Sequence, residues 1–318
     1  MTWLPFICLA IGFIIGIQKL SAYFLVLVDQ AITVTLVLLM LVIGASIGIN
    51  PQVMAKLGMV GFNCAVLALL AITCSILFVF LVEKTILPLE KMQNKLFSDQ
   101  LNIRNEVDLS EQENQKTSHL VWIMPGSIML GIVVGFFILP KTSSDGLSIA
   151  LTFLLIALYI GVGISLGMNK NVFRYVKMLG WKIIFLAIAI FLGSVLAGVI
   201  GGMLLEIPYA ISVTSVSGMS YYSITGAFMT SVYGIEAGTY GFIVNVMREF
   251  FTVLMIPLLI QISKGSPIAG GAAGNMDTML APVTKFVGAE LGLVALITGT
   301  ILTFAVPFIL PFLYRIFL

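Results

Sequence analysis

The segment "MVGFNCAVLALLAITCSILFVFLV", residues 59–82, carries no charged side chain. A helix of this length spans about 36 Å at 1.5 Å per residue, enough to cross the hydrocarbon core of a bilayer. The whole chain has the same character, because 60% of its 318 residues are hydrophobic and only 9% are charged. Soluble domains carry about 25% charged residues. The composition therefore predicts an all-α polytopic membrane protein that lies in the lipid bilayer.

Apolar blocks of this kind predict about eight transmembrane helices. We expect them near residues 2–18, 31–49, 59–82, 121–139, 147–168, 178–205, 239–263 and 289–315. Most lysines and arginines between the blocks fall on one side of the membrane, so the positive-inside rule predicts that both termini face outward from the cytoplasmic membrane. The polar stretch 83–119 is then a cytoplasmic connector.

Several function classes are disfavoured by the residues. The net charge of +2 is too small to suggest a nucleic-acid partner. All three cysteines, Cys8, Cys64 and Cys74, lie inside apolar blocks, which predicts no disulfide framework. The chain shows neither a metal-ligand cluster nor a paired nucleophile and base, so we expect no enzyme activity, no metal site and no cofactor.

Two internal repeats are visible in the sequence. "LVIGASIGIN" (41–50) recurs as "YIGVGISLGMN" (159–169), so the first three spans resemble the next three. Because three is an odd number, successive copies enter the membrane from opposite sides, as in the inverted-topology repeats of secondary transporters. A shorter pair, "SVYGIEAGTYG" (231–241) and "KFVGAELGLVA" (285–295), precedes the last two spans.

A stretch interrupted by Gly, Ser, Pro or Asn lies before each copy of the shorter repeat, at 212–231 and 265–284. Both are apolar enough for the membrane, and we expect two re-entrant, broken segments, with two long surface loops as the alternative. Irregular backbone at membrane depth indicates a substrate site. We therefore expect residues 1–205 to form a scaffold of two inverted three-helix repeats, and 207–318 a transport unit of two re-entrant-plus-helix repeats.

Charges within the apolar blocks indicate where this site lies. Arg248 and Glu249 are adjacent in "NVMREFFTVLMIPLL" (245–259), near the middle of the seventh span, and Asp277 lies at the break in "GNMDTM". A charge at that depth costs several kcal/mol unless it faces a cavity or a partner. Either these residues bind the transported species, or Arg248 holds one of the two carboxylates and locks the segments together.

Three of these motifs carry a family resemblance. "SGMSYYSITG", "NVMREFFTVLMIPLL" and "GNMDTMLAP", in this order and spacing, resemble segments of the LysO-type lysine exporters of bacteria and archaea. The resemblance implies eight spans with both ends outside, and Glu249 and Asp277 as the acidic membrane residues that export needs. Further candidate binding residues in the same motifs are Arg248, Asn245, Ser217, Tyr222, Ser223 and Asn275.

Lysine chemistry fits these residues. At neutral pH the molecule carries two ammonium groups and one carboxylate, and each desolvated ammonium needs an anion, which Glu249 and Asp277 can supply. The substrate carboxylate can be met by Arg248 or by backbone N–H groups at the ends of the broken segments. The sequence leaves both alternatives open.

Energetics constrain the mechanism. Moving a +1 amino acid outward against an interior-negative potential costs about 2.3 kcal/mol per 100 mV, so export needs an inward-moving cation. A proton competing with lysine for one carboxylate gives antiport, and sodium is the alternative coupling ion. We expect a secondary active transporter that exports L-lysine and similar cationic amino acids. A sodium/proton or organic-ion carrier of similar architecture is the alternative, and a homodimer is left open.

Overall fold

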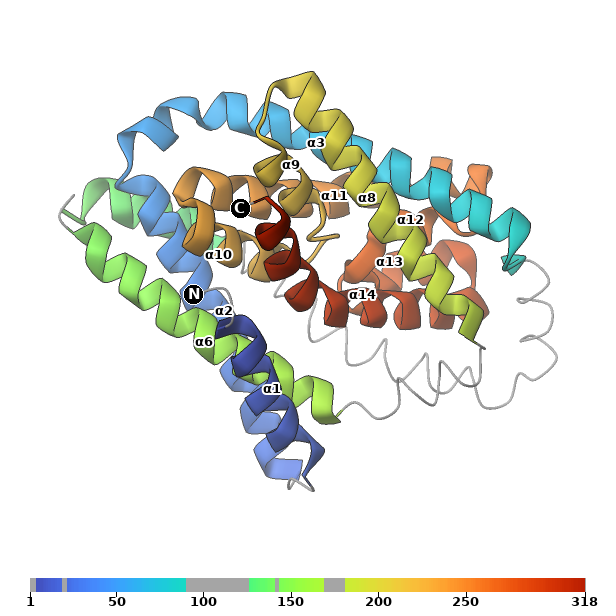
Figure 1. Cartoon of the computed structure of the whole chain (residues 1–318), viewed down its shortest axis with the longest axis horizontal. Helices are drawn as coiled ribbons and strands as arrows, with labels where there is room; N and C mark the ends of the chain where they lie inside the picture. The colour runs from blue at the N-terminus through green and yellow to red at the C-terminus, as the bar shows by residue number, and fades with distance from the viewer. Residues whose placement is uncertain (1–3, 19–21, 90–125, 141–142, 169–180, 318) are drawn as a thin grey trace.

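The computed structural model describes residues 4–18, 22–89, 126–140, 143–168 and 181–317 (Figure 1). The described residues are helical, with no strand among them. Most of the predicted connector 83–119 lies outside these ranges. The long helices are α2 (Ala22–Gly48), α3 (Pro51–Thr85), α6 (Ser144–Met168), α8 (Ile184–Leu205), α11 (Ile235–Ile262) and α14 (Ala289–Ile316). The shorter elements are α1 (Leu4–Ile17), Gly126–Phe137, α9 (Tyr209–Val216), α10 (Tyr222–Tyr233), α12 (Ser266–Gly271), the 3₁₀ helix η3 (Ala272–Met276) and α13 (Leu280–Val287).

The six long helices each contain an apolar stretch long enough to cross a membrane. They coincide with six of the expected spans, which confirms an all-helical polytopic membrane protein. The other two expected spans, near 2–18 and 121–139, correspond to shorter apolar helices at Ile7–Ile17 and Gly126–Phe137. Each of these borders residues outside the described part of the chain.

The helices α1, α2 and α6 form an arm at one side of the molecule (Figure 1). Glycine allows this close packing. A Cβ added to Gly12 would lie 2.2 Å from the Ile160 carbonyl oxygen, and one added to Gly163 would lie 2.5 Å from that of Leu9. Small residues at such spacing let membrane helices approach until their backbones touch. Helices α1 and α6 therefore pack through their glycine faces.

The same kind of contact recurs between α2 and the helix Gly126–Phe137. A Cβ on Gly44 would lie 2.2 Å from the Ile128 carbonyl oxygen, and one on Gly131 would lie 2.3 Å from that of Leu41. The first expected span thus packs on the fifth, and the fourth packs on the second.

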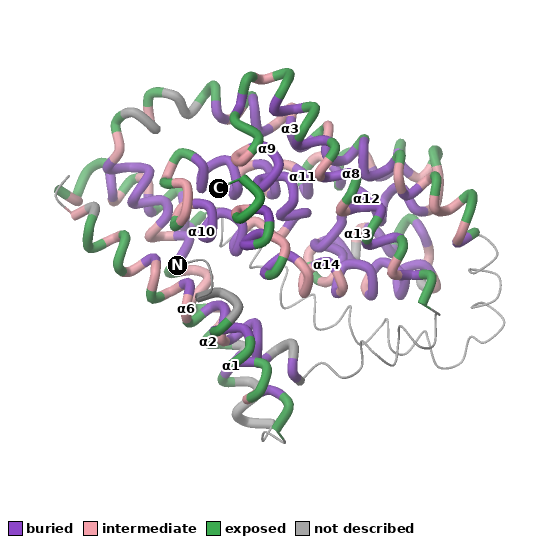
Figure 2. Tube along the Cα trace, viewed as in Figure 1, coloured by how far each residue is buried: buried purple, intermediate pink, exposed green. Residues whose placement is uncertain are grey.

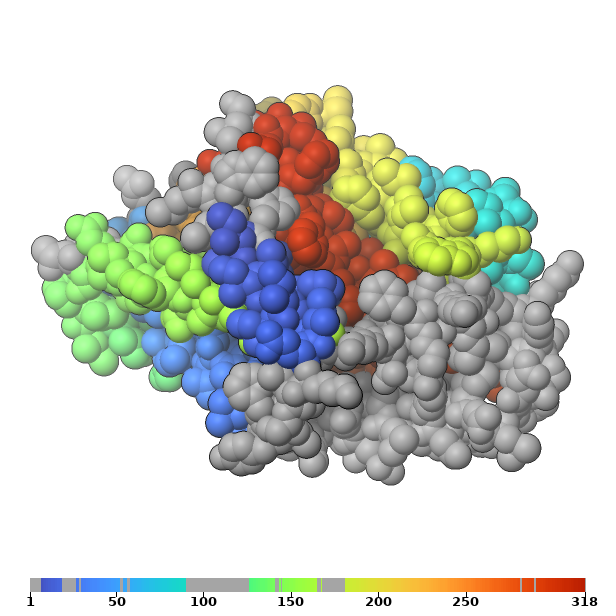
Figure 3. Space-filling view, turned by 60° about the horizontal axis from the view of Figure 1, so that its bottom comes forward, coloured from blue at the N-terminus to red at the C-terminus, as the bar shows by residue number. Residues whose placement is uncertain are grey.

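The larger body contains α3, α8 and α9 to α14. Helix α3 packs on α8, α11 and α12, and α8 also packs on α9. Buried residues concentrate where these helices meet (Figure 2). Residues of α14 lie between α1 and α8 in the space-filling view (Figure 3). Although α3 and α8 belong to the 1–205 region by sequence, their main contacts are with each other and with residues after 207.

Neither 212–231 nor 265–284 forms one continuous helix. The first stretch contains the end of α9, a turn at 217–221 and most of α10, and Met219 and Ser220 in that turn have φ angles of 49° and 76°. The second contains α12, η3 and the start of α13, with Ala272 at φ 49°. These left-handed residues strain the backbone and end the regular helix. Both stretches are helical and largely buried, unlike surface loops.

Candidate functional site

The two interrupted stretches meet at their breaks. The backbone N–H of Ala273 donates to the carbonyl oxygen of Met219 over 2.9 Å. Met219 lies in the turn between α9 and α10, and Ala273 lies in η3. Segments more than 50 residues apart in the chain are therefore joined by a backbone hydrogen bond at the point where each helix is broken.

Asn245 of α11 holds the first break in place. Its Oδ1 accepts the N–H of Ser220 over 2.8 Å, and its Nδ2 donates to the carbonyl oxygens of Ser215 at 2.8 Å and Gly241 at 2.7 Å. The side chain is fully buried, and its amide has partners on both sides. Asn245 thus fixes the strained turn and does not face the cavity described below.

Helix α14 supports the second break. A Cβ on Gly299 would lie only 2.4 Å from the backbone nitrogen of Met276, so the two backbones are in direct contact. Thr303, one turn further along α14, donates its hydroxyl to the carbonyl oxygen of Ala273 over 3.2 Å. Within the break, Nδ2 of Asn275 donates to the carbonyl oxygen of Ile268 over 2.7 Å.

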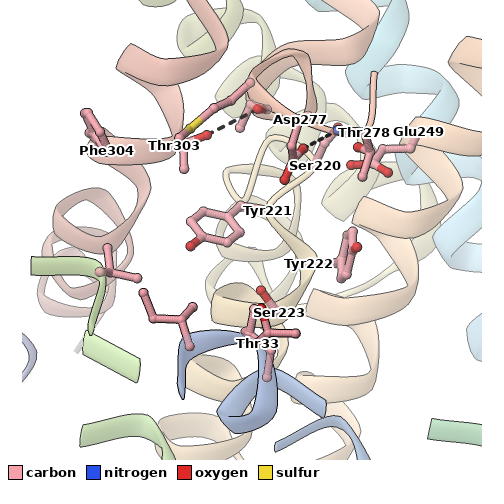
Figure 4. A pocket seen from close by; sticks show the side chains of 16 residues that line it. Thr33, Ser220, Tyr221, Tyr222, Ser223, Glu249, Asp277, Thr278, Thr303 and Phe304 are labelled. Atoms are coloured by element: carbon pink, nitrogen blue, oxygen red, sulfur yellow. Dashed lines mark hydrogen bonds between the residues drawn. The ribbon is translucent and has the colours of Figure 1, made fainter. Parts of the chain in front are cut away.

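A cavity of about 220 Å³ lies between these breaks and the helices α2 and α6. Glu249 and Asp277 both line it, at one end of the view in Figure 4, with Thr33 and Ser223 at the other end and Tyr221 between. The remaining lining residues are Ile32, Leu36, Val162, Ser220, Tyr222, Ala273, Gly274, Met276, Thr278, Thr303 and Phe304.

The two carboxylates differ in their surroundings. Glu249 is 9% exposed, and it fits because Gly274 faces it: a Cβ there would lie 2.7 Å from Glu249 Oε1. Asp277 lines the same cavity but is exposed, and its Oδ1 accepts the backbone N–H of Thr278. Among the described residues, no lysine, arginine or histidine lines this cavity.

Arg248 points away from the cavity. Its Nη1 donates to Ser194 Oγ at 2.8 Å and its Nη2 to Ser75 Oγ at 3.0 Å. Its Nε and Nη2 also donate to the carbonyl oxygens of Gly270 at 3.1 Å and Ala269 at 3.0 Å. Adjacent helical residues project about 100° apart, which lets Glu249 face the cavity while Arg248 faces α3, α8 and α12. This buried guanidinium donates to hydroxyls and carbonyls. The alternative in which Arg248 holds Glu249 or Asp277 is therefore not seen in the structure.

The structure divides the predicted site residues into two sets. Those that line the cavity are Glu249, Asp277, Tyr222 and Ser223. Those that are buried beside it are Arg248, Asn245, Ser217 and Asn275.

The cavity also includes residues that were not predicted to bind, among them Thr33, Ser220, Thr278 and Thr303. Ser220 and Thr278 adjoin the breaks, and Thr33 and Thr303 are polar residues inside apolar blocks. Position next to a break and polarity within a span were therefore the signals available for them.

Known proteins resemble this chain over the region that holds the site. The family model described as "Lysine exporter LysO" matches residues 126–314, which contain all of the cavity except the residues from α2. Lysine exporter LysO of Escherichia coli (strain K12) is 25% identical over 191 residues, which cover 59% of this chain and 62% of that protein. A putative lysine exporter of Haemophilus influenzae (strain ATCC 51907 / DSM 11121 / KW20 / Rd) is 26% identical over 191 residues, 58% of this chain and 94% of that protein.

No solved structure matches the chain. The aligned region of this chain covers less than two thirds of the Escherichia coli protein and nearly all of the Haemophilus influenzae protein. Because the family model covers more than half of the residues, the chain belongs to the LysO lysine exporter family.

Proposed function

We propose that this protein is a secondary active transporter that exports L-lysine from the cytoplasm by antiport with protons. The observation that carries the proposal is the pair of carboxylates, Glu249 and Asp277, facing one cavity that no basic side chain lines among the described residues. Carboxylates at membrane depth without a basic neighbour are costly unless a cation or a proton compensates them. A dibasic amino acid supplies two ammonium groups for this purpose.

The substrate carboxylate has a separate partner in this proposal. Helix α10 starts at Tyr222, and Tyr222 and Ser223 both line the cavity. The first N–H groups of a helix have no intrahelical acceptor and carry partial positive charge. The sequence left two candidate partners for the substrate carboxylate, Arg248 and the backbone N–H groups at a break. Because Arg248 already donates to four other acceptors, the start of α10 is the better candidate.

Coupling follows from competition for the same carboxylates. A proton entering from outside neutralises Glu249 or Asp277 and thereby removes the attraction for an ammonium group. Lysine arriving from the cytoplasm displaces that proton. Sodium can compete in the same way if backbone carbonyls at the breaks complete its shell.

The proposed topology has eight spans, both termini outside, and two inverted three-helix repeats. The packing of the first span on the fifth and of the fourth on the second supports the repeats, because a two-fold axis that relates the two repeats would exchange these two pairs. The proposed moving unit is 207–318. The contacts of α3 and α8 favour adding these helices to it, with α1, α2, α6 and Gly126–Phe137 as the scaffold.

The test is efflux of labelled lysine from proteoliposomes under imposed pH or sodium gradients, with Glu249→Gln and Asp277→Asn beside the parent protein. We expect pH-driven efflux in the parent and its loss in both variants. Glu206→Gln is the matched control, because Glu206 is exposed and lines neither this cavity nor either break. It should keep the parent rate.

Two results would overturn the proposal. If folded parent protein moves no lysine under either gradient, lysine is not the substrate, and lysine-independent sodium/proton exchange in the same vesicles would identify the alternative. If lysine moves but both neutral variants keep the parent rate, the two carboxylates do not form its site.

A further inference from the structure

A second cavity, of about 490 Å³, lies beside the first. Both are lined by α2, α6 and α10, so they follow the same seam between the arm and the body. The lining residues of the second are Ser46, Ile49, Asp145, Ser148, Leu151, Thr152, Leu155, Ile156, Tyr159, Phe228, Thr230, Ser231, Val232, Gly234 and Ile235.

The order of residues along the helices places the second cavity after the first. On α2 the lining passes from Leu36 in the first cavity to Ser46 in the second, about 15 Å further at 1.5 Å per residue. On α6, Val162 lines the first and Tyr159 the second, less than one turn apart. In the proposed topology, the C-terminal end of α2 and the N-terminal end of α6 lie at the outer face of the membrane.

Two tyrosines stand where the cavities adjoin. Tyr159 is 2% exposed, it lines the second cavity, and its hydroxyl has no hydrogen-bond partner among the described residues. Tyr221 lines the first cavity, as does Val162, which lies less than one turn beyond Tyr159 on α6. Buried phenol hydroxyls normally have a partner, and this one, which is closed to solvent, reaches a bound molecule only if its side chain shifts toward the cavity.

Four of the five serine and threonine hydroxyls of the second cavity are arranged as acceptors. A hydroxyl has one hydrogen, and a side chain that donates it to its own helix keeps only lone pairs for a ligand. This occurs at Ser46 (to Val42 O, 2.8 Å), Thr152 (to Ser148 O, 3.0 Å), Thr230 (to Gly226 O, 2.7 Å) and Ser231 (to Phe228 O, 2.7 Å).

The charge of this cavity, like its hydroxyls, favours a cationic hydrogen-bond donor as the ligand. Asp145, in the first turn of α6, contributes a carboxylate, and no lysine, arginine or histidine is among the described lining residues. Ammonium groups are donors with positive charge, so they match a carboxylate surrounded by acceptor oxygens. Tyr159 is the one phenol in the lining, and its hydroxyl can donate to a substrate carboxylate.

We propose that the second cavity is an outer vestibule with its own binding site for a cationic amino acid, separated from the Glu249 and Asp277 cavity by Tyr159 and Tyr221. The amino acid binds there through Asp145 and the acceptor hydroxyls after it leaves the inner cavity. The proposal rests on lysine export as the function and on the outward orientation given above.

Site-directed labelling tests the vestibule. Thr152→Cys is introduced after Cys8, Cys64 and Cys74 have been replaced by alanine, and a membrane-impermeant methanethiosulfonate reagent is added outside intact cells. We expect labelling from outside, slowed about tenfold by lysine at about ten times its half-protecting concentration. Gly58→Cys is the control: it is exposed near the outer end of α3 in the proposed topology, and it lines neither cavity. Lysine should leave its labelling rate unchanged.

Two further variants locate the protecting site. In the labelling background, Asp145→Asn should raise the half-protecting lysine concentration about tenfold, as expected for the loss of one charge-assisted hydrogen bond. Adding Glu249→Gln should leave protection in place, because the vestibule binds independently of the inner carboxylates. Loss of protection with Glu249→Gln would assign the effect to the inner cavity and overturn the vestibule site.

The outcomes separate the two proposals. If the parent transports lysine but Thr152→Cys is unlabelled from outside, or is labelled at a rate that lysine does not change, the vestibule is overturned and export stands. If lysine protects Thr152→Cys but the parent moves no lysine in proteoliposomes, the site stands and the export function fails.

Discussion

Replacing Arg248 by lysine keeps the buried charge but removes the planar fork that carries it. The guanidinium uses three nitrogens to reach Ser75 on α3, Ser194 on α8, and the carbonyls of Ala269 and Gly270 on α12. A lysine ammonium has three N–H groups on a single nitrogen, so it cannot reach all four acceptors from the positions of Nε, Nη1 and Nη2. At least one acceptor loses its partner.

The cost falls on the carbonyls. Ser75 and Ser194 retain a partner because each hydroxyl also donates to the carbonyl oxygen of Ile190, at 3.2 Å and 2.8 Å. A buried acceptor without a partner costs about 1–3 kcal/mol, so losing one or both carbonyl contacts destabilises the protein by about 1–6 kcal/mol. At about 2–4 °C per kcal/mol for a chain of this order of size, the unfolding midpoint should fall by at least about 2 °C.

The measurement is the unfolding midpoint in detergent, with Arg315→Lys as the control because Arg315 is exposed near the end of α14. We expect Arg248→Lys to lower the midpoint and Arg315→Lys to leave it within error. Lysine efflux should fall as well, because Ala269 and Gly270 lie three and two residues before the break at Ala272. A midpoint for Arg248→Lys equal to or above that of the parent would refute a role for the fork in holding α12.

Two glycine substitutions test close contacts at the site and in the arm. Gly274→Ala places a Cβ 2.7 Å from Glu249 Oε1, so the carboxylate must move, and we expect lysine efflux to fall about tenfold without loss of folded protein on size-exclusion chromatography. An unchanged rate would show that the position of this carboxylate does not matter. Gly163→Ala places a Cβ 2.5 Å from the backbone oxygen of Leu9 and should destabilise the protein by about 1–3 kcal/mol, seen as a lower unfolding midpoint. Gly58→Ala is its control, because a Cβ there has no neighbour within 4 Å, and equal midpoints would contradict the contact.

The positions of the long helices could be predicted from the sequence because they depend on local composition. Residues 59–82 have no charge, and they lie within α3, which covers Pro51–Thr85. Which helices pack together could not be read from hydropathy, since lipid-facing and protein-facing surfaces are equally apolar. The grouping of α3 and α8 with the residues after 207 depends on matching surfaces, such as Gly198 of α8, where a Cβ would lie 2.6 Å from the Cα of Val213 in α9.

The candidate-site residues could be predicted where a charged side chain within an apolar span costs free energy. Glu249 and Asp277 are charges within apolar sequence, and both line the cavity. For Arg248 the same cost indicated that the residue is important, but it did not indicate where the side chain points. The sequence does not say which of two neighbours on a helix faces the cavity. Thr33 and Thr303 gave weaker signals, since a threonine can hydrogen-bond to its own helix and is therefore tolerated in an apolar span.

The distribution of hydrogen bonds favours motion along the seam with α2 and α6. On the body side, the breaks are fixed by the bond between Ala273 and Met219, by Asn245 and by Arg248. The arm faces the inner cavity mainly with apolar side chains from α2 and α6, with Thr33 as the polar exception. Apolar contacts are non-directional, so one helix can slide on another without leaving a donor or acceptor unpaired, whereas the breaks cannot rearrange without that cost. A body that moves as one piece past the arm would therefore carry Glu249 and Asp277 along the seam with their geometry intact, and the vestibule lies on that same seam.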